Sequence, residues 1–262
     1  MPSNFIKILF IGDIVGKTGR DVISSLLSAI LSTEKPDLVI ANGENLAGGF
    51  GLNSATSEEM FKSGINVLTS GNHIYDNKDV KEIINDNRVV RPINYHPDLP
   101  GHGYAEMDAR GVNVTVINAL GRVFMQPVDC PFRTVEKFVL EKGKGIYIVD
   151  FHAEATAEKQ ALAAYLDGKV SAIIGTHTHV QTADERILPK GTAFITDAGI
   201  TGSQGGVIGF QSTGAIKRTL YQIPQRFEVD KTLPVFNGVS IKINTETFKA
   251  ESIKRIYRNA ED

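Results

Sequence analysis

The stretch IIGTHTHV, residues 173–180, places two histidines one residue apart at the end of an apolar run. Side chains alternate between the two faces of an extended chain, so the imidazoles of His177 and His179 point to the same side. In open α/β sheets, ligand sites form outside the carboxyl ends of the strands. We therefore expect an α/β fold in which other strands bring further polar side chains to the same edge.

Short apolar runs rich in β-branched residues alternate with segments of helical periodicity along most of the chain. The strand-like runs are residues 5–12, 37–42, 65–71, 112–120, 145–151, 169–175 and 191–199. The helical segments are residues 18–33, 56–63, 134–143 and 155–168. The first helical segment opens on Thr18 and Asp21, which resemble a capping arrangement. This alternation predicts a single α/β domain over residues 1–262 with much parallel strand pairing.

Two segments depart from the alternation. Residues 238–258 contain two strand-like runs around a short turn, which predicts an antiparallel hairpin at the end of the fold. Residues 88–110 are rich in proline and glycine, and we predict a long surface loop there.

The composition excludes several classes of protein. Hydrophobic residues make up 42% of the 262 residues, enough for a sizeable core, and the net charge of -2 gives no case for electrostatic binding of nucleic acid. The single cysteine, Cys130, which we interpret as a buried thiol, suits a reducing cytoplasm. The apolar N-terminal stretch, residues 1–13, is too short for a signal peptide or a membrane span. We therefore expect a cytoplasmic protein with no membrane partner.

Polar side chains follow one predicted strand after another. They are Asp13, Glu44, Asn45, Asn72, His73, His152, His177 and His179. Carboxylate oxygens, amide oxygens and imidazoles are ligands for Mn, Fe or Zn, and this set exceeds what one catalytic metal needs. The pattern predicts two metal ions roughly 3.5–4 Å apart, bridged by a carboxylate, that hold a hydroxide nucleophile and clamp phosphoryl oxygens.

Each of these residues has a structural alternative when it is taken by itself. Asp13 could cap a turn, the Gly-Glu-Asn and Gly-Asn-His triplets could be turns, and His152 could be a hydrogen-bonded core residue. Their arrangement after separate strands favours the metal site. The glycine-rich stretches 45–51 and 201–209 leave two readings open, since they could bring backbone N–H groups to a phosphate or form plain turns. The stretch GDIVGKT has one residue too few between its glycines for a phosphate-binding loop.

The motifs GDIVGKTGR, ANGENLAGGFGL and SGNHIYDN, followed by the block from FHAEAT to GTHTHVQTADERILP, resemble the calcineurin-like metallophosphoesterases. The similarity is closer to the bacterial YmdB-like branch, covers nearly the whole chain and implies a four-layer α/β/β/α sandwich. The superfamily's Asp-x-His is here Asp13-Ile14-Val15, and its Gly-Asp is here Gly43-Glu44-Asn45. Both departures are shared with that branch, whereas the loop 201–209 lacks the proline and acidic residue that the family more often has.

The resemblance implies a specific set of metal ligands, with Glu44 as the bridge and Asn45 in place of the missing histidine. One metal would be held by Asp13, Glu44, Asn45 and His179. The other would be held by Glu44, Asn72, His152 and His177. His73 would lie beside the site as the proton donor.

The resemblance also implies an activity. Members of this branch are phosphodiesterases acting on 2′,3′-cyclic and sometimes 3′,5′-cyclic nucleotides, here by attack of the bridging hydroxide with His73 as general acid. We expect iron or manganese, with zinc as an alternative, a small nucleotide as the partner, and a homo-oligomer with segment 88–110 as one candidate interface. A broad phosphomonoesterase and a regulatory binder that senses a nucleotide with little turnover are the alternatives.

Overall fold

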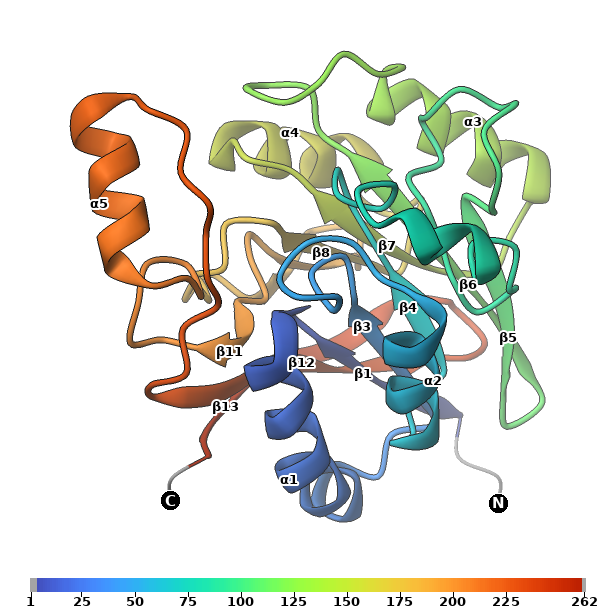
Figure 1. The fold of residues 1–262 in the computed structure, drawn as a ribbon. Helices are drawn as coiled ribbons and strands as arrows, with labels where there is room; N and C mark the ends of the chain where they lie inside the picture. Colours follow the sequence, from blue (N-terminus) through green and yellow to red (C-terminus); the bar gives the residue numbers. More distant parts are fainter. Residues whose placement is uncertain (1–3, 261–262) are drawn as a thin grey trace.

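Two β-sheets lie face to face between layers of helices in the computed structural model, which describes residues 4–260 (Figure 1). Within that range the first sheet has seven strands, and β13 (Ala250–Asn259) pairs with β12 outside the main path. The path runs β2 (Asp13–Ile14), β11 (Ile200–Ser203), β12 (Pro234–Asn244), β1 (Phe5–Ile11), β3 (Leu38–Asn42) and β4 (Val67–Thr69). The second sheet has six strands, β5 (Tyr104–Ala109), β6 (Val112–Leu120), β7 (Ile146–His152), β8 (Ala172–Thr176), β10 (Ala193–Ile195) and β9 (Arg186–Ile187).

Helices cover the outer face of each sheet. They are α1 (Gly16–Glu34) and α2 (Ser54–Lys62) on the first sheet, and α3 (Pro131–Lys142) and α4 (Thr156–Leu166) on the second. Ile8 and Phe10 of β1 pack with Val116 of β6 between the sheets, whereas Leu9 packs outward in the cluster that holds Leu27 of α1. Each such buried side chain contributes about 1.5–3 kcal/mol. The predicted four-layer α/β/β/α sandwich is therefore confirmed.

Parallel pairing determines where the strands deliver their polar residues. β1, β3 and β4 pair in parallel in the first sheet, and β6, β7, β8 and β10 do so in the second. The carboxyl ends of these strands therefore share one edge within each sheet. The predicted C-terminal hairpin is also confirmed, because β12 and β13 pair antiparallel.

The prediction of a surface loop over residues 88–110 was wrong for much of that segment. Val89 and Val90 are buried, and Tyr104–Ala109 is strand β5, which pairs antiparallel with β6. Proline and glycine interrupt regular structure in this segment without keeping it at the surface, because its apolar residues find partners on neighbouring strands.

Two smaller predictions also need correction. Helix α1 begins at Gly16, and its N-cap residue Val15 makes no side-chain hydrogen bond to the helix. The hydroxyl of Thr18 donates instead to the carbonyl oxygen of Asp230, at 2.8 Å. Cys130 is half-buried, where a buried thiol was expected.

Helix α5 (Ser212–Tyr221) and the short 3-10 helix η1 (Lys78–Glu82) were not predicted from the sequence. Figure 1 shows α5 standing apart from the sheets, and none of its residues is buried. Within residues 4–260, none of the helices is both long and apolar enough to cross a bilayer. The first three residues of the N-terminal stretch lie outside the described range, and the assignment of residues 1–262 to one domain stays a prediction.

Candidate metal centre

The polar residues predicted from the sequence gather where the carboxyl ends of the two sheets meet. Asp13 lies in β2, His152 ends β7, and the others follow β3, β4 and β8. The structure joins them in one network of short contacts, which includes Asp13, Glu44, Asn45, Asn72, His73, His152, His177 and His179. No predicted site residue lies elsewhere.

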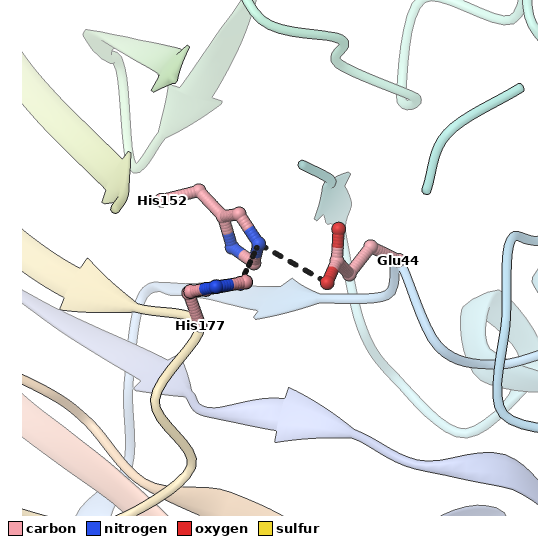
Figure 2. A group of neighbouring side chains, drawn as sticks. All are labelled: Glu44, His152 and His177. Carbon is pink, nitrogen blue, oxygen red and sulfur yellow. Dashed lines mark hydrogen bonds and ion pairs between the residues drawn. The ribbon is translucent and has the colours of Figure 1, made fainter. Parts of the chain in front are cut away.

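Glu44, His152 and His177 form the centre of this network (Figure 2). Oε1 of Glu44 lies 3.1 Å from Nε2 of His152, which lies 3.0 Å from Nδ1 of His177. Each of the three offers a ligand atom within 4.8 Å of the other two. Glu44 and His152 are buried, whereas His177 is partly exposed. One carboxylate and two imidazoles at this spacing can share a metal ion.

Asp13, Asn45 and His179 form a second group beside this centre. Nε2 of His179 lies 3.8 Å from Oδ1 of Asp13 and 3.4 Å from the side-chain nitrogen of Asn45. The Asn45 amide also donates to Oε1 of Glu44, at 3.2 Å. Nδ1 of His179 lies 2.8 Å from the carbonyl oxygen of Ile208, so it carries the proton and leaves the Nε2 lone pair directed at the site.

Asn72 reaches the centre from the loop after β4. Its Oδ1 lies 3.2 Å from Nε2 of His152. The preceding residue, Gly71, packs so closely that a Cβ atom there would overlap both the Glu44 carboxylate and the His152 imidazole. A glycine is therefore required at this position of the SGNH motif.

His73 lies next to the centre and is half-buried. Its backbone N–H donates to Oε2 of Glu44 at 3.2 Å, and its Nδ1 lies 2.7 Å from Oδ2 of Asp76. The edge of the ring meets the ring of Phe50, with the centroids 5.0 Å apart. Among residues 4–260, Nε2 of His73 has no hydrogen-bond partner. Asp76 thus orients the imidazole and leaves one nitrogen for a substrate.

The turn that carries His177 and His179 is strained and is held by a buried ion pair. Their φ angles are 94° and 65°, in the left-handed region, at a cost of about 1–3 kcal/mol each. Between them, Thr178 donates from its backbone N–H and its hydroxyl to Oδ2 of Asp197, at 3.1 and 2.7 Å. The ammonium group of Lys159 donates to the same oxygen at 2.8 Å, and both charged residues are buried. The Lys159–Asp197 pair therefore fixes the turn.

A buried carboxylate, Asp150, supports His152 from below. The hydroxyl of Thr176 donates to Oδ1 of Asp150 at 2.6 Å and lies 2.9 Å from Nδ1 of His152. Asn42 and Thr69 donate to the other carboxylate oxygen, at 2.9 and 2.5 Å. Because Thr176 uses its proton on Asp150, it accepts from Nδ1–H of His152, and Nε2 is the nitrogen that faces the centre.

The electrostatics of the buried groups show what the site favours. Burial raises the pKa of Glu44, but the charge and hydrogen bond of His152, together with the neighbouring imidazoles, lower this pKa to about 2. Burial lowers the pKa of His152, but Glu44, Asp13 and Asp150 raise it to about 9. Burial and the charge on His152 lower the pKa of His177 to about 3. The buried carboxylates thus favour a positive charge on His152. A second positive charge on His177 is disfavoured, because the two imidazoles would repel each other.

The residues present fit a metal centre. The potential ligands are carboxylates, imidazoles and side-chain amides, which bind Mn, Fe or Zn through oxygen or imidazole nitrogen. Asn72 directs its Oδ1 at the centre, whereas Asn45 directs its nitrogen there and would bind a metal with its amide group turned over. Oδ1 of Asp13 is buried and has no hydrogen-bond partner among the described residues, which is rare for a carboxylate oxygen in a protein interior. A cation would satisfy this oxygen and the inward-facing imidazole nitrogens together.

A cavity of about 530 Å³ opens beside this centre. Glu44, His73, His177 and His179 contribute to its wall, and helix α5 contributes further residues. The centre is therefore accessible to a small molecule.

The residues that support the ligands were not predicted from the sequence. They are Asn42, Thr69, Asp150, Lys159, Thr176 and Asp197. Two of them carry a signal in the sequence. Asp150 stands two residues before His152 and so lies on the same face of β7. Lys159 lies on the buried stripe of α4 with Leu162 and Leu166, a position where a lysine requires a partner.

The sandwich of two sheets with this donor set at the strand ends defines a protein with the metallophosphoesterase fold. A family model described as "YmdB-like protein" matches residues 9–256, and the chain belongs to that family. The chain is 45% identical to a 2′,3′-cyclic-nucleotide 2′-phosphodiesterase of Bacillus subtilis, over 97% of each of the two proteins.

Two solved structures have a similar fold over nearly the whole chain. A phosphatase of Mycoplasma pneumoniae superposes with a TM-score of 0.93 at 35% identity, over 97% of this chain and 94% of that one. A hypothetical protein of Thermus thermophilus superposes with a TM-score of 0.92 at 37% identity, over 97% of this chain and 99% of that one.

Proposed function

We propose that the chain is a metal-dependent phosphodiesterase that hydrolyses 2′,3′-cyclic nucleotides. The observation that carries this proposal is the convergence of carboxylate, amide and imidazole groups around Glu44, in a chain 45% identical to an enzyme named for that activity. No thiolate or serine–histidine pair takes part in the network, so covalent catalysis by those groups has no support among the described residues.

The chain's own residues divide into two ligand groups that share Glu44. Asp13, Asn45 and His179 with Glu44 would hold one metal ion, and the other would be held by Asn72, His152 and His177 with Glu44. When bound, such a pair of metal ions neutralises charge on phosphoryl oxygens and makes water nucleophilic at neutral pH. His152 donates from Nδ1 to the Thr176 hydroxyl, and His179 donates from Nδ1 to the Ile208 carbonyl oxygen. These two hydrogen bonds leave Nε2 of each imidazole for ligation.

His73 supplies the proton in this proposal. In the proposed hydrolysis a water oxygen bonds to phosphorus, the bond between phosphorus and O2′ breaks to leave a 3′-phosphate, and the departing O2′ needs a proton. His73 lines the cavity, and Asp76 holds its Nδ1, so Nε2 is the nitrogen that carries and delivers this proton. The Glu44 carboxylate accepts from the His73 backbone N–H and so keeps the donor beside the metal centre.

A substrate panel with the metal-loaded protein tests the proposal. We expect turnover of 2′,3′-cyclic nucleotides to exceed that of p-nitrophenyl phosphate. We expect 3′,5′-cyclic nucleotides to be hydrolysed more slowly than 2′,3′-cyclic nucleotides. Faster hydrolysis of the monoester would favour the broad phosphatase, in line with the similar Mycoplasma pneumoniae protein, which is described as a phosphatase. Tight nucleotide binding with no product from any diester would favour a regulatory binder and contradict the proposal.

The choice of metal, the location and the assembly stay predictions. Iron or manganese suits the mixed nitrogen and oxygen donors, and zinc is compatible with them. A cytoplasmic location is supported by the single cysteine. Elemental analysis and light scattering on the purified protein would test the metal and the homo-oligomer.

A further inference from the structure

The cavity beside the metal centre has a second wall that the metal ligands do not explain. This wall combines aromatic rings with polar groups of helix α5. It includes Phe50, Phe210, Phe227, Arg218, Thr219 and Gln222. We propose that it is a nucleoside subsite, in which the base of the substrate packs against the aromatic rings and Arg218 contacts the polar edge of the base. This inference rests on the proposed function, since it assigns the part of a nucleotide that lies outside the reacting phosphate.

The position of the cavity supports the subsite. One continuous space of about 530 Å³ is bounded by Glu44 and His177 of the metal centre and by Arg218 of α5. Sites for small ligands commonly measure about 300–1,000 Å³ and are mostly apolar with a few polar groups. A phosphate at the metal centre would therefore leave its nucleoside inside the same space.

The aromatic rings offer a surface suited to a base. Phe50 and Phe210 are stacked with their centroids 5.3 Å apart and their planes 15° apart, and Phe227 lies 5.5 Å from Phe210. Phe50 and Phe227 are only half-buried, so part of each ring remains open. Phe50 also touches His73, which connects the rings to the proposed proton donor. Any nucleobase can stack on such rings, because every base has a flat aromatic face.

Arg218 adds the polar component. Its guanidinium group lies over the Phe227 ring, 5.3 Å from the centroid. Within residues 4–260, no carboxylate lies within ion-pair distance of this group, although it lines a cavity that also contains Glu44. The ring atoms and carbonyl oxygens of bases accept hydrogen bonds from guanidinium groups. Arg218 therefore has free donors at a place where the substrate would present acceptors.

The placement of Arg218 is not explained by burial in the core of the sheets. Helix α5 has no buried residue, so the helix contributes no side chain to the core of the sheets. Its side chains Ala215, Arg218 and Thr219, with Gln222 just after the helix, nevertheless face the cavity that contains the catalytic centre. A helix placed in this way can select a substrate without supporting the fold.

Two cyclic phosphates with the same reacting group separate the subsite from the catalytic centre. Adenosine 2′,3′-cyclic phosphate carries a base, whereas glycerol 1,2-cyclic phosphate has the same five-membered ring and no base. For the metal-loaded Arg218→Ala variant, we expect KM to rise roughly tenfold for the nucleotide relative to the glycerol compound, with kcat for the nucleotide nearly constant. Lys217→Ala, which removes the neighbouring charge outside the cavity, is the matched control. Equal changes in KM for both substrates, or no change for either, would overturn the subsite.

A binding measurement keeps this test independent of turnover. Calorimetric titration with 3′-AMP and with glycerol 1-phosphate compares two phosphomonoesters that differ in the nucleoside. We expect the wild-type protein to prefer 3′-AMP and Arg218→Ala to lose roughly tenfold of that preference. If wild type cleaves neither cyclic phosphate yet shows this Arg218-dependent preference, the proposed function fails and the subsite stands. If wild type cleaves the nucleotide without any such preference, the function stands and the subsite fails.

Discussion

The two walls of the cavity are built in different ways. At the strand ends, Glu44 and His179 line the cavity, are 1% and 6% exposed, and are held by hydrogen bonds to neighbouring segments. On helix α5, the cavity-lining residues Arg218 and Thr219 are exposed, and no residue of the helix is buried. The first wall is part of the core, and the second is placed over it.

This difference separates chemistry from selection. Buried, hydrogen-bonded groups move only when much of the fold opens, whereas segments with few buried contacts open locally at low cost. Metal ligands need fixed positions, and the strand-end wall provides them. The α5 wall can adjust to the substrate, so changes there should alter specificity more than stability or metal binding.

The largest expected effect concerns His73, where the two walls meet. His73→Ala should lower kcat for a 2′,3′-cyclic nucleotide about 10²–10⁴-fold, because it removes the proton donor but no metal ligand. Steady-state kinetics with elemental analysis would measure both properties. His96→Ala, at an exposed position, is the control. Full activity in His73→Ala would show that another group protonates the leaving oxygen.

A smaller effect is expected at the buried ion pair beneath the strand-end wall. Lys159→Met removes the cation that holds Asp197 and so loosens the turn with His177 and His179. Loss of such outer contacts typically weakens metal affinity about 10–100-fold. Metal titration of the purified variant would measure this, with Lys169→Met at a surface ion pair as the control. Unchanged metal affinity would mean that the turn holds its conformation without the pair.

The smallest effect is expected on α5. Leu220→Ala should change the free energy of unfolding by no more than about 0.5 kcal/mol, because the side chain is exposed. Leu27→Ala on α1, where the side chain is 1% exposed, should cost about 2–5 kcal/mol. Urea denaturation of both variants gives the comparison. Similar losses would show that α5 is packed into a core or an interface and would remove the contrast between the walls.

The same contrast explains what the sequence could predict. The α/β class and the strand-end residues were predictable because Asp13, Glu44, His152 and His177 each follow a local strand pattern, and parallel pairing brings such ends together. The four-layer sandwich was implied by the family resemblance and not by these patterns. Strand β5 could not be predicted, since its pairing with β6 and not its own composition makes it extended. The Lys159–Asp197 pair joins residues 38 positions apart, and no local period reports that contact.

Metal analysis of the wild-type protein and of Glu44→Gln tests the central claim most directly. Glutamine keeps the volume of Glu44 but lacks the charge to bridge two cations. We predict about two ions per chain in the wild-type protein and loss of bound metal in a folded Glu44→Gln variant. Two ions per chain in Glu44→Gln, or no stoichiometric metal in the wild-type protein, would contradict the account.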